Sequence, residues 1–327
     1  MTHDWRPQAS LETLRQRAQV LAIIREFFAK RGVLEVETPA LMPTTATDIY
    51  IDSFHVDTRV DPQREIGQYL FLQTSPEFPL KRLLAAGSGA IYQLAKVFRR
   101  EQASKRHSAE FTMLEWYRPG YTLDTLMDEV EALVVEVFDA TTGDAARVTE
   151  IAIARVTYRD LFLEHLNIDP HVASDQDFES LAHEKIALSA EGLSRTDYLQ
   201  LLLAHCIEPS LPFACFIYDY PVQQAALARI EVDRTGQAVA RRFELFIAGM
   251  ELANGYFELQ DAREQRARFE ADIAERERRG FDAVPLDEKL LAALEHGLPE
   301  CSGVALGVDR LIMAALGKKD IREVQAF

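Results

Sequence analysis

Two neighbouring stretches of the chain place an arginine, carboxylates and aromatic rings at a spacing of two residues. The stretches 91–98 and 110–117 read as β-strands joined by the polar segment 99–109. Residues two apart share one face of a strand. Before the loop, this spacing groups Val97, Arg99 and Glu101. After the loop, it groups Phe111, Met113, Glu115 and Tyr117. A half-exposed hairpin with salt bridges also fits the charged positions. Because large aromatic rings are costly to expose together, the pattern favours a ligand-binding surface.

Several common catalytic and nucleotide-binding motifs are missing. The sequence has no GxxxxGK[ST] phosphate loop, no GxSxG nucleophile turn and no HExxH zinc helix. Gly87-Ser88-Gly89 lacks the third glycine of a dinucleotide fingerprint. If the protein handles ATP, it therefore does so on a different scaffold.

The hairpin and two further segments resemble one family. FRREQASKRHSAEFTMLEWY closely resembles motif 2 of the class II aminoacyl-tRNA synthetases, in the lysyl-type subgroup. RGVLEVETPALMP resembles motif 1, with Pro39 as its hallmark, and SGVALGVDRLIMAALG resembles motif 3, with Gly307, Asp309 and Arg310. ELANGYFELQDAREQ resembles the lysine-pocket segment of lysyl-tRNA synthetase. Three ordered motifs are far more specific than one. The resemblance implies an α+β fold, the class II synthetase catalytic core, with a mixed, mainly antiparallel sheet flanked by helices.

The resemblance implies an ATP site with two catalytic arginines. Arg99 would bind the α-phosphate, which suits a bidentate guanidinium, and Arg310 would hold the γ-phosphate from a helix N-terminus. Glu244 and Glu251 would be the ligands of Mg²⁺, a hard cation that takes oxygen ligands. The other residues assigned to ATP are Glu101 for the adenine amino group, Phe111 for stacking on the base, Arg106 and His107 for the terminal phosphates, and Arg100, Ser108, Leu245 and Gly307. At position 108 the family usually has asparagine.

The resemblance also implies an amino-acid pocket, assigned to Ser75, Pro76, Glu77, Glu115, Tyr117, Glu251, Asn254, Glu258 and Ala305. The glutamates at 77, 115 and 258 would repel one another unless a cation binds among them, so the ligand should carry amino groups. The alternative is that these carboxylates pair with a lysine or arginine of the protein itself. Glu251 has the opposite strand parity to Asn254 and Glu258, which predicts a bend at the Asn254–Gly255 step.

Two departures from the lysyl-type pattern bear on the substrate. Motif 1 begins near residue 31, so we expect no anticodon-binding domain, and a principal contact with tRNA is then missing. Ala305 replaces the first glycine of G-x-G-x-D-R in motif 3. This alanine is either neutral drift or a reshaped pocket floor that favours a different position of the substrate amine. A misplaced amine that leaves a polar partner unpaired can be rejected by about 10⁴-fold or more.

A stand-alone lysyl-type domain with this alanine is similar to the family of ligases that activate (R)-β-lysine with ATP and attach it to a lysine of elongation factor P. That resemblance implies ATP and Mg²⁺ as cofactors, elongation factor P as the acceptor and a homodimer built through motif 1. One alternative is a truncated synthetase relative that activates L-lysine for another acceptor or forms a different amide. Another is a regulatory subunit that binds an amino acid without catalysis, although such proteins usually lose the ATP arginines.

The elements that must position these groups mix strands and helices without a βαβ alternation. Strands are predicted at 69–74, 91–98, 110–117, 214–220, 241–259 and 302–308, and helices at 10–30, 76–87, 123–138 and 262–279. Residues from about 140 to 212 are predicted to be a mostly helical insertion. Helices gathered around antiparallel-type strands indicate an α+β fold, and we expect residues 1–327 to form a single catalytic domain.

Composition limits the class of partner and the compartment. The chain has 327 residues, with 52 acidic and 36 basic side chains and a formal net charge of −16. Binding to phosphate backbones depends mainly on Lys and Arg, so this balance makes tRNA an unlikely partner. The cysteines 206, 215 and 301 show no metal-ligand spacing, and no apolar run approaches the ~20 residues of a membrane span. We therefore expect a cytoplasmic protein without membrane contact.

Overall fold

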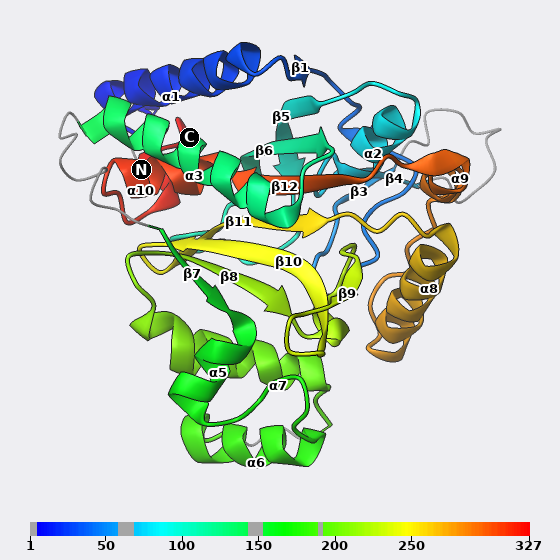
Figure 1. Cartoon of the computed structure of the whole chain (residues 1–327). Coiled ribbons are helices and arrows are strands. Elements are labelled where there is room, and N and C mark those ends of the chain that lie inside the picture. Colours follow the sequence, from blue (N-terminus) through cyan, green and yellow to red (C-terminus); the bar gives the residue numbers. More distant parts are fainter. Residues whose placement is uncertain (1–4, 58–68, 143–152, 189–191) are drawn as a thin grey trace.

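The computed structural model describes residues 5–57, 69–142, 153–188 and 192–327. These residues form a nine-stranded sheet in the spatial order β1-β5-β6-β12-β11-β10-β8-β7, with β9 paired to β10 (Figure 1). The two outermost pairs, β1 with β5 and β7 with β8, are parallel, and the other pairs are antiparallel. The strands are β1 (Leu34–Glu35), β5 (Ile91–Phe98), β6 (Glu110–Pro119), β7 (Ala154–Thr157), β8 (Ala214–Tyr220), β9 (Ile230–Val232), β10 (Ala238–Ile247), β11 (Met250–Phe257) and β12 (Cys301–Gly307).

A small second sheet lies beside the first. It has the order β2-β4-β3 and consists of β2 (Leu41–Met42), β3 (His55–Asp57) and β4 (Tyr69–Leu72). The strand predicted at 69–74 is confirmed in β4, but Tyr69 at its start is exposed rather than buried. The short strands and the chain between them place the segment 43–52 close to the functional site described below.

One face of the large sheet is covered by three helices, α1 (Leu11–Lys30), α3 (Leu123–Thr142) and α10 (Val308–Ala315). Every second strand residue, such as Leu114 and Trp116 of β6 and Leu306 of β12, is buried in a core shared with these helices. Strand alternation therefore turns Met113, Glu115 and Tyr117 to the other face. That other face carries the functional site.

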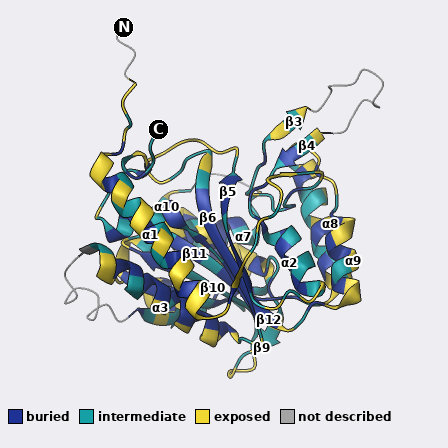
Figure 2. Cartoon of the chain, turned by 90° about the horizontal axis from the view of Figure 1, so that it is seen from above, coloured by how far each residue is buried: buried dark blue, intermediate teal, exposed yellow. Residues whose placement is uncertain are grey.

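Helix α1 begins and ends where the sequence predicts, but a different face of it is buried. Ser10 caps the helix by accepting a hydrogen bond from the Thr13 amide, and Gly32 follows with a φ of 64°. The apolar residues 11, 14, 18 and 21 predict the helix by their spacing, yet the buried side chains come mainly from Val20 onward. The outward faces of α1 and of α8 (Ala262–Arg278) are lined with exposed residues in Figure 2.

Helices α5 (Tyr158–Leu166), α6 (Asp175–Ile186) and α7 (Arg195–Leu202) form a second core against β7 and β8. A π-helical turn, Leu203–Ile207, and a 3₁₀ turn, Glu208–Ser210, follow α7 directly. This region matches the segment predicted to be mostly helical, with one addition. Strand β7 is only four residues long and pairs with β8 from far along the chain, so local periodicity did not reveal it.

The opposite end of the sheet is covered by α2 (Glu77–Ala85), α8 (Ala262–Arg278) and α9 (Glu288–Gly297), which share a third core. Pro76 stands at the N-cap of α2, and Asp261 caps α8 by accepting hydrogen bonds from two backbone amides. Helix α9 was not predicted. Short 3₁₀ turns at Val222–Gln224 and Ile321–Glu323 complete the described elements. The mixed, mainly antiparallel sheet with flanking helices confirms the predicted α+β fold class.

Among the described residues, no helix combines the length and apolar character needed to cross a membrane.

Candidate active site

One row of side chains crosses four strands on the face opposite to α1 and α3. Glu115 of β6 is directly opposite Ala305 of β12, and Ala305 is directly opposite Asn254 of β11. Asn254 in turn pairs with Glu244 of β10. Paired residues on neighbouring strands point to the same face with Cβ atoms about 5 Å apart. Sheet pairing therefore brings together four predicted site residues that the sequence spreads over 190 positions.

A second row lies two residues away along the strands β6, β12 and β11, and it contains Tyr117, Gly303 and Tyr256. A Cβ atom built on Gly303 would come within 2.3 Å of the Tyr117 ring and 2.6 Å of a Glu258 carboxylate oxygen. The glycine is thus required by the close approach of these side chains. Gly307, in the next row, has no atom nearer than 3.8 Å to such a Cβ.

A β-bulge turns Glu251 to the site. The β10–β11 register shifts between Leu245 and Phe246, where β11 carries Leu252 as an extra residue. The bend expected from strand parity exists, but the prediction of its position at Asn254–Gly255 was wrong: both of those residues keep regular pairs with β10. A bulge needs only one additional residue and leaves no strong mark in the sequence.

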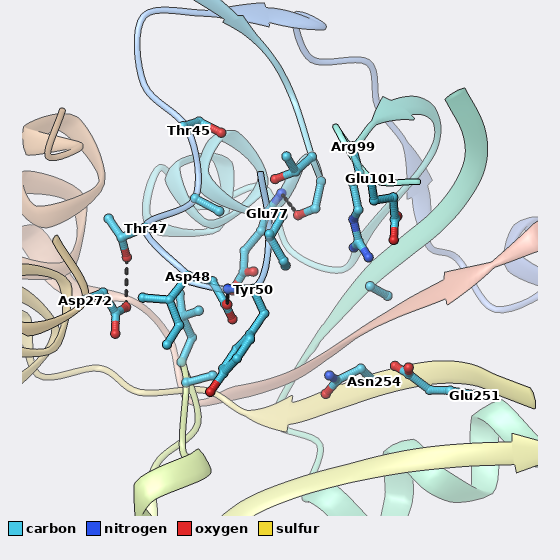
Figure 3. Close-up of a pocket in the computed structure, with 18 of the residues that line it drawn as sticks. Thr45, Thr47, Asp48, Tyr50, Glu77, Arg99, Glu101, Glu251, Asn254 and Asp272 are labelled. Carbon is cyan, nitrogen blue, oxygen red and sulfur yellow. Dashed lines mark hydrogen bonds between the residues drawn. The ribbon is translucent and has the colours of Figure 1, made fainter. Parts of the chain in front are cut away.

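These elements enclose a cavity of about 930 Å³. Figure 3 shows Arg99 directed towards the side where Glu251 and Asn254 lie on β11. The predicted site residues that line the cavity are Ser75, Glu77, Arg99, Glu101, Arg106, His107, Ser108, Phe111, Glu244, Glu251, Asn254, Ala305, Gly307 and Arg310. The cavity wall also includes residues from the segment 43–52, from α7 and from α8, which the sequence did not assign to the site.

One end of the cavity carries the two predicted catalytic arginines. The Arg99 guanidinium lies 5.2 Å from the centre of the Phe111 ring. Its Nε is buried and has no hydrogen-bond partner within the described part of the chain. Arg310 lies in the first turn of α10 and donates to the Glu251 carbonyl oxygen at 2.7 Å. Two positive groups beside an aromatic face suit a nucleotide, whose base stacks on the ring and whose phosphates bind the guanidinium groups.

The loop between β5 and β6 closes over Arg310. Arg310 Nη2 and His107 Nε2 are 2.9 Å apart, and Arg310 Nε donates to the Arg106 carbonyl oxygen at 3.3 Å. Burial lowers the pKa of His107, and the neighbouring Arg310 charge lowers it further. The imidazole is therefore neutral at pH 7 and accepts the hydrogen bond from Arg310. Arg106 donates to the Gly249 carbonyl oxygen in the β10–β11 turn at 2.7 Å. This bond links the loop to strands β10 and β11, which carry Glu244 and Glu251.

Glu244 and Glu251 fit a cation bound together with phosphates. Burial raises the pKa of Glu244 to about 7; Arg242 opposes the rise and the Glu251 charge adds to it. A cation between the two carboxylates would remove this repulsion. No group of three or more His, Cys, Asp and Glu side chains within the described ranges is arranged to hold a metal ion. One or two carboxylates plus substrate phosphates are a common arrangement for Mg²⁺.

The predicted amino-acid pocket lies beneath the other end of the cavity. Glu115, Tyr117 and Glu258 are at most 2% exposed and do not line the cavity themselves. Tyr117 donates to Glu115 at 2.8 Å, while the second carboxylate oxygen of Glu115 has no hydrogen-bond partner among the residues that the structure describes. Burial raises the pKa of Glu115 to about 8, and the Glu77 charge contributes to the rise. Glu115 is therefore largely protonated at neutral pH.

Two of the three glutamates in this pocket are paired with a lysine that the sequence did not assign to the site. Lys81 Nζ lies 2.6 Å from a Glu77 oxygen and 2.6 Å from a Glu258 oxygen. For these two acids the alternative interpretation, pairing within the protein, is the one the structure shows. The argument that three unpaired carboxylates demand a cationic ligand is therefore wrong. Lys81 follows Glu77 by one helical turn, a spacing that could have suggested the contact.

Three other predicted residues are placed away from the cavity. Arg100 is exposed and pairs with Asp52 at 2.6 Å and Asp282 at 2.8 Å. Leu245 is fully buried in the core beneath the sheet. Pro76 is buried at the start of α2 and does not line the cavity.

Comparison with known proteins agrees with this fold and site. The family of class II tRNA synthetases (D, K and N) matches residues 2–327, and the chain belongs to this family. Within it, the chain is similar over nearly its full length to proteins named elongation factor P–(R)-β-lysine ligase. The relative from Avibacterium paragallinarum is 46% identical, with 99% of this chain and 98% of the relative covered. The relative from Vibrio vulnificus is 47% identical, with 100% and 98% covered.

Proposed function

We propose that this protein is an ATP-dependent, AMP-forming ligase that activates (R)-β-lysine as its adenylate and transfers it to the ε-amine of a lysine on elongation factor P. The observation that carries the proposal is the row in which Ala305 lies between Glu115 and Asn254. It occurs in a chain 46–47% identical to ligases of that name. The two arginines and the aromatic ring of an ATP site line the same cavity.

The reaction needs no enzyme nucleophile. In the first step a carboxylate oxygen of the substrate bonds to the α-phosphorus of ATP while the bond to pyrophosphate breaks. In the second step the acceptor amine, after losing a proton, bonds to the adenylate carbonyl carbon, and the bond to AMP breaks. Arg99 and Arg310 stabilise the charge that develops on the phosphates, which is the type of electrostatic stabilisation that usually contributes most.

The remaining residues orient the substrates. Phe111 stacks on the base and Glu101 binds its exposed edge, while His107 holds Arg310 in place as a neutral hydrogen-bond acceptor. Glu115 and Asn254 flank the substrate amine on either side of Ala305. Mg²⁺, when bound, would be held by Glu244 and Glu251 and would supply neutralisation of phosphate charge.

The proposal is tested by ATP–pyrophosphate exchange with (R)-β-lysine and with L-lysine in parallel. We expect (R)-β-lysine to support faster exchange, and mass spectrometry of elongation factor P to show one added lysyl group after incubation with ATP and this isomer. Exchange with L-lysine alone would instead favour the second candidate, a lysyl-type enzyme that serves another acceptor. No exchange with either isomer would leave an amino-acid-binding regulatory protein.

We further propose that residues 1–327 act as one catalytic domain in a cytoplasmic homodimer. Leu34 of β1 and Leu41 of β2, both in the segment that resembles motif 1, are apolar and exposed at 56% and 38%. Exposed apolar side chains in this segment support an interface there. Light scattering coupled to gel filtration would give the mass, and a Leu34→Glu variant should run as a monomer if this surface forms the interface.

A further inference from the structure

Lys81 is one of the most deeply buried side chains among the described residues, and no step of the proposed reaction uses it. It is 2% exposed, on the inner side of α2. A lysine without partners would be expected to lose its proton at such a position. Here burial lowers the pKa of Lys81, but the charges of Glu258 and Glu77 outweigh burial and raise it above the usual range. Lys81 is therefore a cation inside the protein.

Its two partners come from opposite walls of the amino-acid pocket. Glu77 begins α2 and faces the cavity, where its backbone amide donates to Ser75 Oγ at 3.0 Å. Glu258 follows β11 and is 1% exposed. Lys81 Nζ lies at 2.6 Å from an oxygen of each. The lysine thus connects a helix and a strand that are 177 positions apart in the sequence.

The lysine also controls how much charge the pocket carries. Burial raises the pKa of Glu258 to about 7, and the Lys81 ammonium opposes a further rise. The same ammonium opposes the rise of the Glu115 pKa. The titratable groups around Lys81 are Glu77 on α2, Glu115 and Tyr117 on β6, Tyr256 on β11, Glu258 after it and Cys301 on β12.

We propose that Lys81 is an internal counter-ion and a positioning residue of the amino-acid pocket. Its ammonium group balances the charge of the two carboxylates that it contacts, Glu77 and Glu258, and fixes their direction, so that the pocket presents negative charge to the substrate amine. Two carboxylates around one ammonium group leave an excess of negative charge, which suits a terminal ammonium group of the substrate. The inference rests on the proposed function for the identity of the substrate, but the counter-ion role itself does not depend on it.

Removal of the charge with the side-chain length preserved, Lys81→Met, should leave two buried carboxylates without a partner. We expect the KM for (R)-β-lysine to rise about 10-fold or more, while the KM for ATP changes by less than about twofold because the arginines lie at the other end of the cavity. The matched control is Lys289→Met, at an exposed lysine of α9. Equal increases of both KM values in Lys81→Met would reduce Lys81 to a purely structural role.

A second variant separates charge from packing. In Lys81→Met/Glu258→Gln one carboxylate is removed with the lysine, so the pocket keeps the same excess of carboxylates over ammonium groups. If Lys81 acts as a counter-ion, the double variant should be more stable than Lys81→Met alone and should recover part of the affinity for the amino acid. If the losses of stability and of affinity caused by the two substitutions simply add, the counter-ion role is overturned.

The pH dependence of stability gives a readout that requires no substrate. In Lys81→Met the pKa values of the buried carboxyls rise further above their unfolded values. Carboxyls of this kind stabilise the fold at low pH, and the stability is lost as pH rises through the folded pKa. The melting temperature of Lys81→Met should therefore fall between about pH 6 and pH 9 much more steeply than that of the wild type. A parallel pH profile for both proteins would contradict the proposal even if the substrate proves to be another amino acid.

Discussion

Ala305 occupies the position where the predicted amino-acid pocket departs from the G-x-G-x-D-R pattern of the lysyl-type synthetases. Glu115 and Asn254 flank it on neighbouring strands, and both side chains point to the same face. A single methyl group at this place changes where an amine can lie between a protonated carboxyl group and an amide. Under the proposed function, this geometry would connect a one-carbon difference in the protein to the choice between α- and β-amino acids.

Substitution of Ala305 by glycine should shift the preference towards L-lysine. We expect the ratio of kcat/KM for (R)-β-lysine over L-lysine to fall by about 10-fold, within the range that one methylene-sized change gives. The control is Ala95→Gly, since Ala95 lies on the same face of β5 opposite Met113. A ratio that changes equally in both variants would argue against a special role for position 305.

Arg99 and Arg100 form a matched pair of neighbours with different surroundings. Arg99 lines the cavity over Phe111, whereas Arg100 is exposed and bound to two aspartates. Arg99→Ala should lower ATP–pyrophosphate exchange by about 10²-fold or more, as loss of a group that stabilises transition-state charge does. Arg100→Ala should stay within a few-fold of the wild type. Similar losses of exchange activity in both variants would show that the activity depends on the loop as a whole rather than on the Arg99 guanidinium.

At the level of elements, α1 is linked to the start of α10 through a buried ion pair. Arg17 Nη1 lies 2.7 Å from Asp309 Oδ1, and Arg17 Nη2 donates to Thr112 Oγ1 at 2.8 Å. Asp309 also accepts a hydrogen bond from the Thr112 amide at 2.6 Å. The arrangement fixes the residue immediately before Arg310, so α1 helps to position an arginine that lines the cavity.

Arg17→Met should therefore destabilise the protein by about 3 kcal/mol, because it leaves the Asp309 carboxylate buried without its charged partner. Arg15→Met is the control on the same helix: Arg15 is 75% exposed and 3.5 Å from Glu12, and exposed pairs contribute about 0–1 kcal/mol. Denaturant unfolding of both variants measures the difference. Equal free energies of unfolding would show that the Arg17–Asp309 pair contributes nothing net.

A second connection joins elements that surround the cavity. Tyr50 donates to Asp197 of α7 at 2.7 Å, and Arg279, just after α8, lies 2.9 Å from the same carboxylate. Burial alone would raise the pKa of Asp197, but hydrogen bonds from Arg279, Ser194 and Tyr50 outweigh it and lower the pKa to about 2. Three segments that surround the cavity are thereby joined at one aspartate.

The sign of the pH effect follows from this lowered pKa. Asp197 stabilises the fold above its unfolded pKa of about 4, and that stability is lost as pH falls towards 2. Asp197→Asn should cost about 1 kcal/mol at pH 7 and much less near pH 3, so the stability curve of the variant should be flatter on its acid side. Chemical denaturation of both proteins at both pH values provides the comparison. If the stability of the variant fell as steeply with decreasing pH as that of the wild type, the acid sensitivity would come from other carboxylates.

For the whole molecule, the sequence predicts the structural features that depend on residues close to one another in the chain. The Ser10 cap of α1, the β5–β6 hairpin and the ordered motifs are local. They indicate the fold class and the cavity residues of the β5–β6 hairpin, β11 and the start of α10, but not those of the segment 43–52, α7 and α8. The features that were missed depend on distant pairing. Strand β7 is defined only by β8, the bulge at Leu252 only by β10, and Lys81 by a glutamate contributed from the far end of β11. Periodicity and spacing carry no direct signal for such contacts.

The alternating small residues of β12 have a consequence for how enzymes of this fold diverge. Gly303 cannot gain a side chain without displacing the Tyr117 ring, and Gly307 lies beside Arg310. Position 305 lies between them and already carries a methyl group. Selection for a new amino-acid substrate therefore has a site at which single mutations can alter what fits while the nucleotide end stays intact. An ancestral enzyme could pass from one lysine isomer to the other through functional intermediates, without rebuilding its catalytic apparatus.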